Sequence, residues 1–209
     1  MLSPNDHVLF FGDSITDAGR NRNAAPGDSA GWGTGYVYQL AARLGADLAD
    51  YELTFSNQGI GGNRITDLET RLQSDVLAHL PNLVSILIGI NDVWRRYDSG
   101  AVSPLSEFAA SYRRILENLS AAQIEIVILE PFLLPVPTDR HAWREDLNPK
   151  IDAIRDLARE FEATYVPLDG VFAAASTRRE SGFWLPDGVH PSPAGHALIA
   201  EAWLSAVVG

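Results

Sequence analysis

The chain has 209 residues and a formal net charge of −11 at pH 7, from 27 acidic and 16 basic residues. This acidic balance argues against nucleic acid and against an anionic membrane as partners. The sequence contains no cysteine, which excludes disulfides, thiolate catalysis and cysteine-ligated metal sites.

The length and the 46% hydrophobic content suit a globular protein, and we expect one domain over residues 1–209. Residues 1–6 show no basic region followed by a long apolar stretch, and no apolar run approaches the ~20 residues of a membrane span. We therefore expect neither a signal peptide nor a transmembrane helix, and a cytoplasmic protein.

Residues 7–11 form an apolar, β-favouring run that ends at Gly12-Asp13-Ser14. A run too short for a core helix and closed by glycine predicts a buried strand. In an open α/β sheet, chemistry gathers at the carboxyl ends of the strands. Ser14 follows such an end where a helix would begin, so unpaired backbone N–H groups there favour a developing negative charge. The alternative role for Ser14 is that of a plain N-cap.

The next segment, residues 17–31, is a polar loop by composition. Within it, Gly27-Asp28-Ser29-Ala30-Gly31 matches the G-x-S-x-G pattern of a nucleophile elbow. That motif needs a strand before it and a helix after it, and neither is predicted here, so we interpret Ser29 as a loop serine. No stretch spells G-x-G-x-x-G, so the dinucleotide-binding fingerprint is absent.

Apolar periodicity predicts the remaining elements, with Pro149 expected to break or kink one helix and Ser192-Pro193 to begin the last. Residues 131–137, rich in proline, are expected to form an ordered loop over the sheet edge. Five strands alternating with helices predict a doubly wound, flavodoxin-like α/β fold: a parallel sheet with helices on both faces. The predicted helices are residues 36–48, 65–80, 106–119, 141–161 and 193–204, and the later strands are residues 53–57, 83–90, 124–129 and 164–168.

Two turns that follow predicted strands carry polar or glycine-rich sequence. Residues 57–64 hold three glycines in a run of four, which permits φ > 0 and lets main-chain N–H groups approach a ligand, although a tight turn alone would also explain them. Residues 83–90 are the most apolar run and predict a central strand. It ends at Asn91-Asp92, at the same sheet edge as Ser14, where the alternative role for Asn91 is to cap a turn.

Before the last predicted helix, Asp187 stands three residues ahead of His190. Gly188 between them and Pro191 after them suit a turn that presents both side chains on one side. Hydrolysis by a serine needs an imidazole to take the hydroxyl proton and an acceptor at its other nitrogen. The other histidines have weaker claims: His7 begins the first predicted strand, His79 ends a predicted helix, His141 lies in a helical stretch without an acidic partner at turn spacing, and His196 lies inside the last predicted helix.

Taken in order, Ser14 in Gly-Asp-Ser, Gly62 closing Asn-x-Gly-x-x-Gly, Asn91 in Gly-x-Asn-Asp, and Asp187-x-x-His190 resemble the four blocks of the SGNH (GDSL-type) hydrolases. The resemblance implies a serine esterase that needs no metal or cofactor. It also implies that Ser14 attacks the ester, that His190 acts as base and then acid, and that Asp187 orients His190. The oxyanion hole would comprise the backbone N–H groups of Ser14 and Gly62 and the Asn91 amide.

Residues 11–17, 33–36 and 89–95 resemble the intracellular acetylxylan-esterase branch of these hydrolases. No lid interrupts the strand–helix alternation, which favours a short acyl group over a long one. The expected partner is therefore a small ester, such as an acetylated xylo-oligosaccharide, and homo-oligomerisation is left open. The candidate substrate-binding residues are Asp13, Trp32, Arg64, Trp94 and Trp184; the tryptophans offer faces for sugar rings or serve only in packing.

Two other functions compete with acetyl-ester hydrolysis. One is a lysophospholipase or thioesterase of the same family. The other, from a different class, is a non-catalytic flavodoxin-like ligand-binding protein, which would leave Asp187 and His190 without a use and lacks a Walker-type loop.

Overall fold

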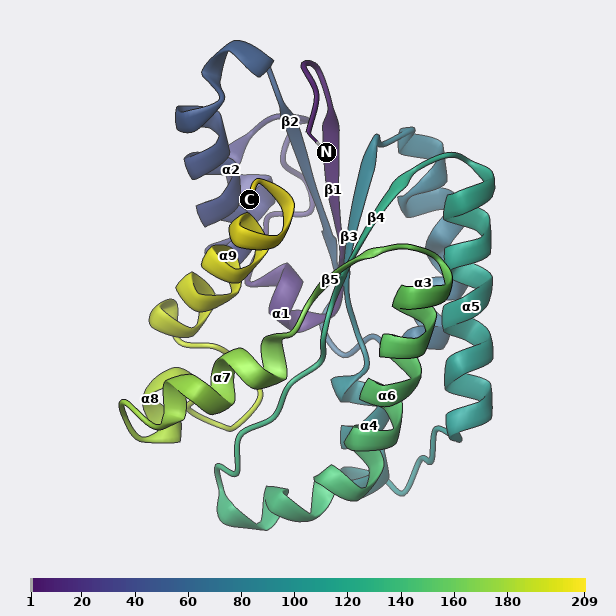
Figure 1. Cartoon of the computed structure of the whole chain (residues 1–209), viewed down its shortest axis with the longest axis vertical. Coiled ribbons are helices and arrows are strands. Elements are labelled where there is room, and N and C mark those ends of the chain that lie inside the picture. The colour runs from purple at the N-terminus through teal and green to yellow at the C-terminus, as the bar shows by residue number, and fades with distance from the viewer. Residues whose placement is uncertain (1) are drawn as a thin grey trace.

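A five-stranded sheet runs through the middle of the molecule, with helices packed on both of its faces (Figure 1). The computed structural model describes residues 2–209. The strand order is β2-β1-β3-β4-β5, and every neighbouring pair is parallel, which confirms the predicted doubly wound α/β fold. The strands are β1 (His7–Gly12), β2 (Thr54–Gly59), β3 (Leu83–Leu87), β4 (Glu125–Leu129) and β5 (Thr164–Val166).

Helices α2 and α9 cover one face of the sheet, and α3, α5 and α6 cover the other (Figure 1). Within residues 2–209, no helix combines the length and apolarity needed to cross a membrane. The α-helices are α1 (Ser14–Asp17), α2 (Tyr36–Asp47), α3 (Ile65–Asp75), α4 (Ile90–Asp98), α5 (Leu105–Ala121), α6 (Arg144–Glu160), α7 (Leu168–Ser176), α8 (Ser181–Trp184) and α9 (Pro193–Val207). The 3-10 turns are η1 (Ser29–Trp32), η2 (Ala49–Tyr51), η3 (Leu77–His79) and η4 (Thr138–Trp143).

Strand β1 is apolar without interruption because it is covered on both faces. Its side chains alternate between two separate cores: Val8 and Phe10 enter the core under α2 and α9, whereas Leu9 and Phe11 enter the core under α3 and α5. All four side chains are fully buried. Burial on both faces is what makes a central parallel strand read as a continuous apolar run rather than an alternating one.

Strands β1 and β3 lie side by side, with Gly12 paired to Leu87 at their carboxyl ends. The chain leaves β1 toward β2 on one side and leaves β3 toward β4 on the other. Connections that diverge in this way open a crevice at the carboxyl edge of the sheet. The helices that follow these two strands begin at Ser14 and at Ile90, so the topology brings Ser14 and Asn91 to one crevice.

Several element ends differ from the sequence predictions. The helix predicted over residues 65–80 ends at Asp75 and gives way to η3. The strand predicted over residues 83–90 ends at Leu87, because Gly89 takes φ 128° and starts the unpredicted α4. Strand β2 continues to Gly59, two residues past its predicted end.

Helix α6 continues through Pro149, which was expected to break or kink it. The proline removes the hydrogen bond to the carbonyl of Glu145, and both residues are exposed, so water can replace the lost donor. Residues 131–137 form no regular element, as predicted, and the first four of them are buried. Helices α7 and α8 were not predicted; α7 holds a glycine in its first turn and both are short, so periodicity had little to act on.

Candidate active site

Ser14 is the first residue of α1, and its hydroxyl faces His190. The residue that caps this helix is Asp13, whose Oδ1 accepts the Ile15 N–H at 3.0 Å. The Ser14 side chain therefore has no capping bond to make, and Ser14 Oγ lies 2.9 Å from His190 Nε2. An N–H-rich helix start and an imidazole thus converge on one half-buried hydroxyl.

Asp187 holds the imidazole of His190 from the other side. His190 Nδ1 lies 2.7 Å from Asp187 Oδ2, while Asp187 Oδ1 accepts the backbone N–H groups of Val189 at 3.0 Å and His190 at 2.7 Å. The hydrogen-bond network assigns the Nδ1 proton to the Asp187 bond and leaves the Nε2 lone pair facing Ser14.

The electrostatics of this pair favour an ionised acid beside a basic imidazole. The hydrogen bond to Asp187 raises the pKa of His190, against the opposing effect of burial. Burial disfavours the charge on Asp187, but the bonds from the His190 ring and from two backbone N–H groups hold the pKa of Asp187 well below its usual range. Asp187 is therefore ionised at neutral pH and can stabilise an imidazolium at His190.

The turn that carries Asp187 and His190 is packed against the loop after β4. Gly188 has φ +81°, and a Cβ there would lie 2.4 Å from the Leu134 carbonyl oxygen and 2.5 Å from that of Val136. The Leu134 N–H donates to the Gly188 carbonyl at 3.0 Å. Only glycine fits this combination of close backbone approach and left-handed conformation.

The glycine-rich turn after β2 lies next to Ser14. A Cβ placed on Gly61 would stand 3.8 Å from the Ser14 Cβ, and Gly62 follows with φ +82°. Among residues 2–209, neither the Ser14 N–H nor the Gly62 N–H donates to a protein acceptor. Two backbone donors beside the Ser14 hydroxyl are thus available to a ligand.

Asn91 is buried at the start of α4 and joins two of the turns around Ser14. Its Nδ2 donates to Asp13 Oδ2 at 3.3 Å and to the Asn63 carbonyl at 3.1 Å. Donation from Asn91 to an oxyanion would share or replace one of these bonds. The carboxamide is therefore held at the crevice by partners from β1–α1 and from the turn after β2.

Two carboxylates are buried beneath these turns. Asp13, a candidate substrate-binding residue, is 0% exposed, and burial raises its pKa to about 7. Asp92 is 1% exposed, and burial raises its pKa to about 6, although its oxygens accept the Ile65 N–H and the Ser103 hydroxyl, each at 3.0 Å. Both residues stabilise the turns through their hydrogen bonds. In the sequence, only its position after Asn91 pointed to this role of Asp92.

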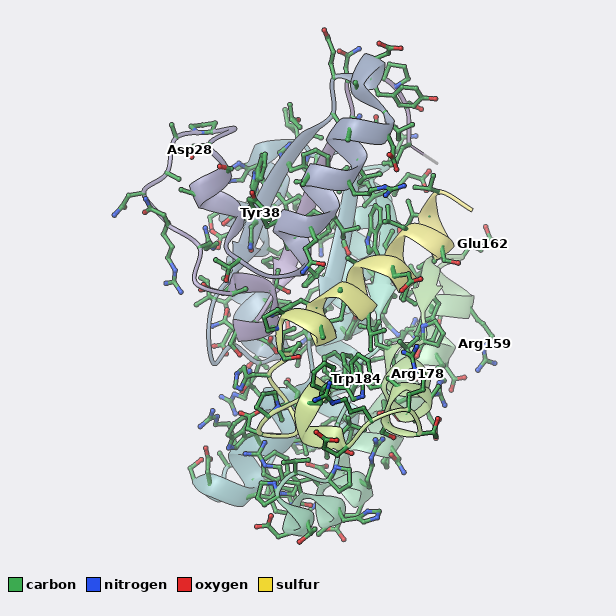
Figure 2. All side chains as sticks on the ribbon, turned by 90° about the vertical axis from the view of Figure 1, so that its left-hand side faces the viewer. Asp28, Tyr38, Arg159, Glu162, Arg178 and Trp184 are labelled. Carbon is green, nitrogen blue, oxygen red and sulfur yellow. The ribbon has the colours of Figure 1, made fainter. Side chains whose placement is uncertain are left out.

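The three candidate tryptophans occupy different places. The Trp94 ring lies 5.8 Å from the His190 ring. Trp32 donates its Nε1–H to the Phe55 carbonyl at 3.2 Å and packs on that residue beside β2. Trp184 is half-buried at the edge of the core beside Arg178, whose guanidinium carbon is 5.3 Å from its ring centre (Figure 2). Within residues 2–209, Trp94 is thus the candidate whose ring contacts the imidazole.

Among residues 2–209, none of the remaining candidates forms a hydrogen bond to the Ser14 hydroxyl. Arg64 caps α3 through its backbone N–H, which donates to Asp67 at 2.8 Å. Ser29 is exposed and begins η1 rather than following a strand. His196 is buried between α2 and α9, where its Nδ1 accepts the Tyr36 N–H at 3.2 Å.

Sequence reasoning missed Arg140 and Trp143, which the fold brings beside Trp94. The guanidinium carbon of Arg140 lies 4.4 Å from the Trp94 ring centre and 4.6 Å from the Trp143 ring centre. Both missed residues lie in η4, some fifty positions away from Trp94 in sequence, so no local pattern links them.

Comparison with known proteins agrees with this geometry. The model of the GDSL-like lipase/acylhydrolase family matches residues 10–198. An acetylxylan esterase from Geobacillus stearothermophilus is 32% identical over 207 residues, which cover 97% of this chain and 94% of that protein.

Solved structures show the same architecture. A crystal structure of a putative GDSL-like lipase from Parabacteroides merdae superposes with a TM-score of 0.95 at 32% identity, covering 100% of this chain and 98% of the other. The acetylxylan esterase Axe2 from Geobacillus stearothermophilus gives a TM-score of 0.89 at 33% identity, covering 97% and 94%. Two further Axe2 structures are of catalytic mutants, one with a serine and one with a histidine changed to alanine.

Proposed function

Because the chain belongs to the GDSL-like lipase/acylhydrolase family and is a serine ester hydrolase of the SGNH type, we propose that it removes acetyl groups from acetylated xylo-oligosaccharides or related short sugars. The observation that carries the chemistry is the line of hydrogen bonds from Ser14 through His190 to Asp187. The acetyl group and the sugar are supported by the relatives, which include an acetylxylan esterase and an acetyl-xylooligosaccharide esterase.

In the proposed first step, His190 Nε2 takes the Ser14 hydroxyl proton while Ser14 Oγ attacks the ester carbonyl. The tetrahedral oxyanion is held by the backbone N–H groups of Ser14 and Gly62, with the Asn91 carboxamide as a third donor. Asp187 stabilises the imidazolium and fixes its ring. His190 then gives its proton to the departing alkoxide, leaving an acetyl group on Ser14.

In the second step, water attacks the acetyl carbonyl, and His190 Nε2 takes the proton of that water. Collapse of the second tetrahedral intermediate returns the proton to Ser14 Oγ and releases acetic acid, which ionises to acetate at neutral pH. The same donors serve both oxyanions because the carbonyl oxygen occupies one place throughout.

The surroundings of Ser14 favour a bulky alcohol and a small acyl group. The His190 side chain is 44% exposed, so the alcohol side of the site is open to solvent. On the other side, the turns after β1, β2 and β3 converge on Ser14 through buried Asp13 and Asn91. A long acyl chain, as in a lysophospholipid or a fatty thioester, would need an apolar channel along which to extend.

The test varies the acyl chain on a fixed alcohol, and then the alcohol on a fixed acyl group. We expect kcat/KM for p-nitrophenyl acetate to exceed that for the octanoate, and acetate to be released from acetylated xylo-oligosaccharides. Ser14→Ala serves as the inactive control. Faster turnover of a long-chain ester or a lysophospholipid than of any acetylated sugar would replace this function with the lipid or thioester alternative.

A further inference from the structure

Arg140 in η4 carries an unpartnered guanidinium close to His190. Its Nη1 is shielded from solvent and has no hydrogen-bond partner. Among residues 2–209, the other atoms of this side chain form no hydrogen bond or ion pair either. A buried donor without an acceptor costs free energy, so its retention calls for an explanation in ligand binding or in a bound solvent molecule.

Other arginines of this acidic chain do find carboxylates. Arg144, in the next helix, forms two bonds of 2.7 Å to Asp169, and Arg155 pairs with the buried Glu130. These arginines thus form ion pairs with carboxylates. Within residues 2–209, Arg140 pairs with no carboxylate, and its Nη1 is buried without a partner.

Aromatic rings hold the Arg140 guanidinium in place. It lies against both Trp94 and Trp143, at 4.4 and 4.6 Å from their ring centres, which are themselves 5.5 Å apart. Trp143 is itself fixed, because it is buried and stacks on Tyr97 at 5.1 Å with 14° between the rings. A stacked guanidinium loses little conformational freedom when it binds an oxygen in the plane of its donors.

The chain also ties this arrangement to the turn of His190. The loop of residues 131–137 leads into η4 and bonds to Gly188 through the Leu134 N–H at 3.0 Å. The Trp94 ring lies 5.8 Å from the His190 ring. Arg140 is therefore placed relative to the imidazole by two independent paths, one through the backbone and one through Trp94.

We propose that Arg140 binds the alcohol part of the substrate by donating from its guanidinium to an oxygen on the sugar next to the ester. This rests on the proposed function, in which His190 protonates the departing alkoxide. The alcohol must then lie on the His190 side of Ser14, which is the side that Trp94 and Arg140 occupy. The acceptor is a sugar hydroxyl or a sugar carboxylate, both of which suit a guanidinium.

The charge of Arg140 has a second measurable effect. The hydrogen bond to Asp187 raises the pKa of His190, and the positive charge of Arg140 acts in the opposite direction. Removing that charge should therefore raise the pKa observed in kcat/KM, even for a substrate that Arg140 does not touch. A residue that served only to fill space would not produce this shift.

The experiment compares Arg140→Met, which keeps an unbranched apolar stem against the indoles, with Arg140→Lys and with Arg159→Met. Arg159 is a matched control because it is 75% exposed on α6 and pairs only with Asp156. Each variant is assayed on phenyl acetate, on acetylated xylobiose, and on an acetylated xylobiose that carries a uronate. Thermal unfolding of each variant shows that it is folded.

At a pH above the His190 ionisation, we expect for Arg140→Met a roughly tenfold to hundredfold loss in kcat/KM on an acetylated sugar, mostly through KM, and a change within about twofold on phenyl acetate. Arg140→Lys should recover part of the loss. A loss on neutral xylobiose identifies a hydroxyl acceptor, whereas a loss confined to the uronate substrate identifies a carboxylate.

Equal losses on phenyl acetate and on the sugars, or no loss on either, would overturn the assignment of Arg140. Failure of the proposed function looks different. In that case the wild-type enzyme would cleave phenyl acetate but neither acetylated sugar, which would also remove the ligand assigned to Arg140.

Discussion

Ser14 has its hydroxyl free because the neighbouring residue caps the helix. Asp13 takes the Ile15 N–H, and Ser14 Oγ is left to face His190 Nε2 at 2.9 Å. Ser29, in the G-x-S-x-G match, also follows a capping aspartate, because Asp28 accepts the Ala30 N–H at 2.9 Å. Its hydroxyl is nevertheless exposed and, among residues 2–209, has no hydrogen-bond partner. At the residue scale, what distinguishes a nucleophile is the partner of its hydroxyl rather than the pattern of letters around it.

An organophosphonate probe should therefore add its mass to the peptide that holds Ser14. Ser14→Ala should abolish labelling, and Ser29→Ala should leave it intact, because the Ser14 hydroxyl, unlike that of Ser29, has an imidazole within hydrogen-bond distance. Mass spectrometry of the digested protein makes the assignment. Label on Ser29 in the wild type would contradict the proposed role of Ser14.

Asn91→Ala should lower kcat by roughly 10²–10³, the usual loss for one oxyanion donor, with little change in KM. Because Asn91 also donates to Asp13 and to the Asn63 carbonyl, thermal unfolding must be measured beside the kinetics. Asn118→Ala is a control, since Asn118 is exposed on α5 and bonds only its own helix. A near-normal kcat would contradict a role in the oxyanion hole and would show that Asn91 only joins two turns.

The rate should rise with pH as His190 loses its proton and becomes a base. Asp187 raises the pKa of His190, so the ionisation in kcat/KM should lie above the ordinary histidine value of about 6.5. Asp187→Asn should remove most of the activity, because the Nδ1 tautomer is no longer enforced. If Asp187→Asn kept full activity, another group would have to orient His190.

At the scale of elements, the turn before α9 and the loop after β4 depend on each other. The loop has no regular structure, yet its first residues are buried and it bonds to Gly188. Helix α9 begins just beyond the turn, with Ser192 Oγ accepting the Gly195 N–H at 3.2 Å. The position of His190 is thus set by a fixed helix start on one side and a packed loop on the other.

Gly188→Ala should lower stability by at least about 2 kcal/mol, since a Cβ would meet two carbonyl oxygens and the residue has φ +81°. Activity should fall with it, because the turn cannot move without moving Asp187 and His190. Gly170→Ala in α7 is the matched control: a Cβ there meets nothing within 4 Å. Thermal unfolding and kcat/KM on phenyl acetate measure both effects, and an unchanged Gly188→Ala protein would contradict them.

At the scale of the whole molecule, buried titratable groups make stability depend on pH in opposite directions. Burial lowers the pKa of His196 to about 4, so the folded state binds this proton less readily than the unfolded state does. The contribution of His196 to the free energy of unfolding is complete above about pH 6.5 and is lost as the pH falls toward 4. Asp13, with its pKa raised to about 7, acts oppositely: its contribution is present at low pH and is lost as the pH rises through 7.

Replacing His196 by glutamine should therefore flatten the acid side of the stability curve. Glutamine retains an acceptor for the Tyr36 N–H but takes no proton between pH 4 and 6.5. The wild type should lose as much as about 3 kcal/mol through this residue across that interval, and the variant should not. Urea unfolding at pH 4.5 and at pH 7 gives the change in the free energy of unfolding between the two pH values. An equal change for the wild type and the variant would contradict the prediction.

The sequence by itself determined which segments form the five strands and that helices alternate with them. Those features follow from local periodicity and turn chemistry, because a strand covered on both faces must be apolar throughout. The ends of β3 and α3 and the presence of α4 and α7 escaped it, since short helices and strand ends depend on the surrounding contacts.

Only the tertiary structure decided the strand order, and with it the meeting of Ser14 and His190 across 176 positions of sequence. It also decided that Trp94 lies against the imidazole, whereas Trp32 packs on β2 and Trp184 packs at the edge of the core beside Arg178. Arg140 gains its place against two indoles from packing between α4 and η4. Such contacts join segments that share no local pattern, so they depend on how the folded sheet brings its connections together.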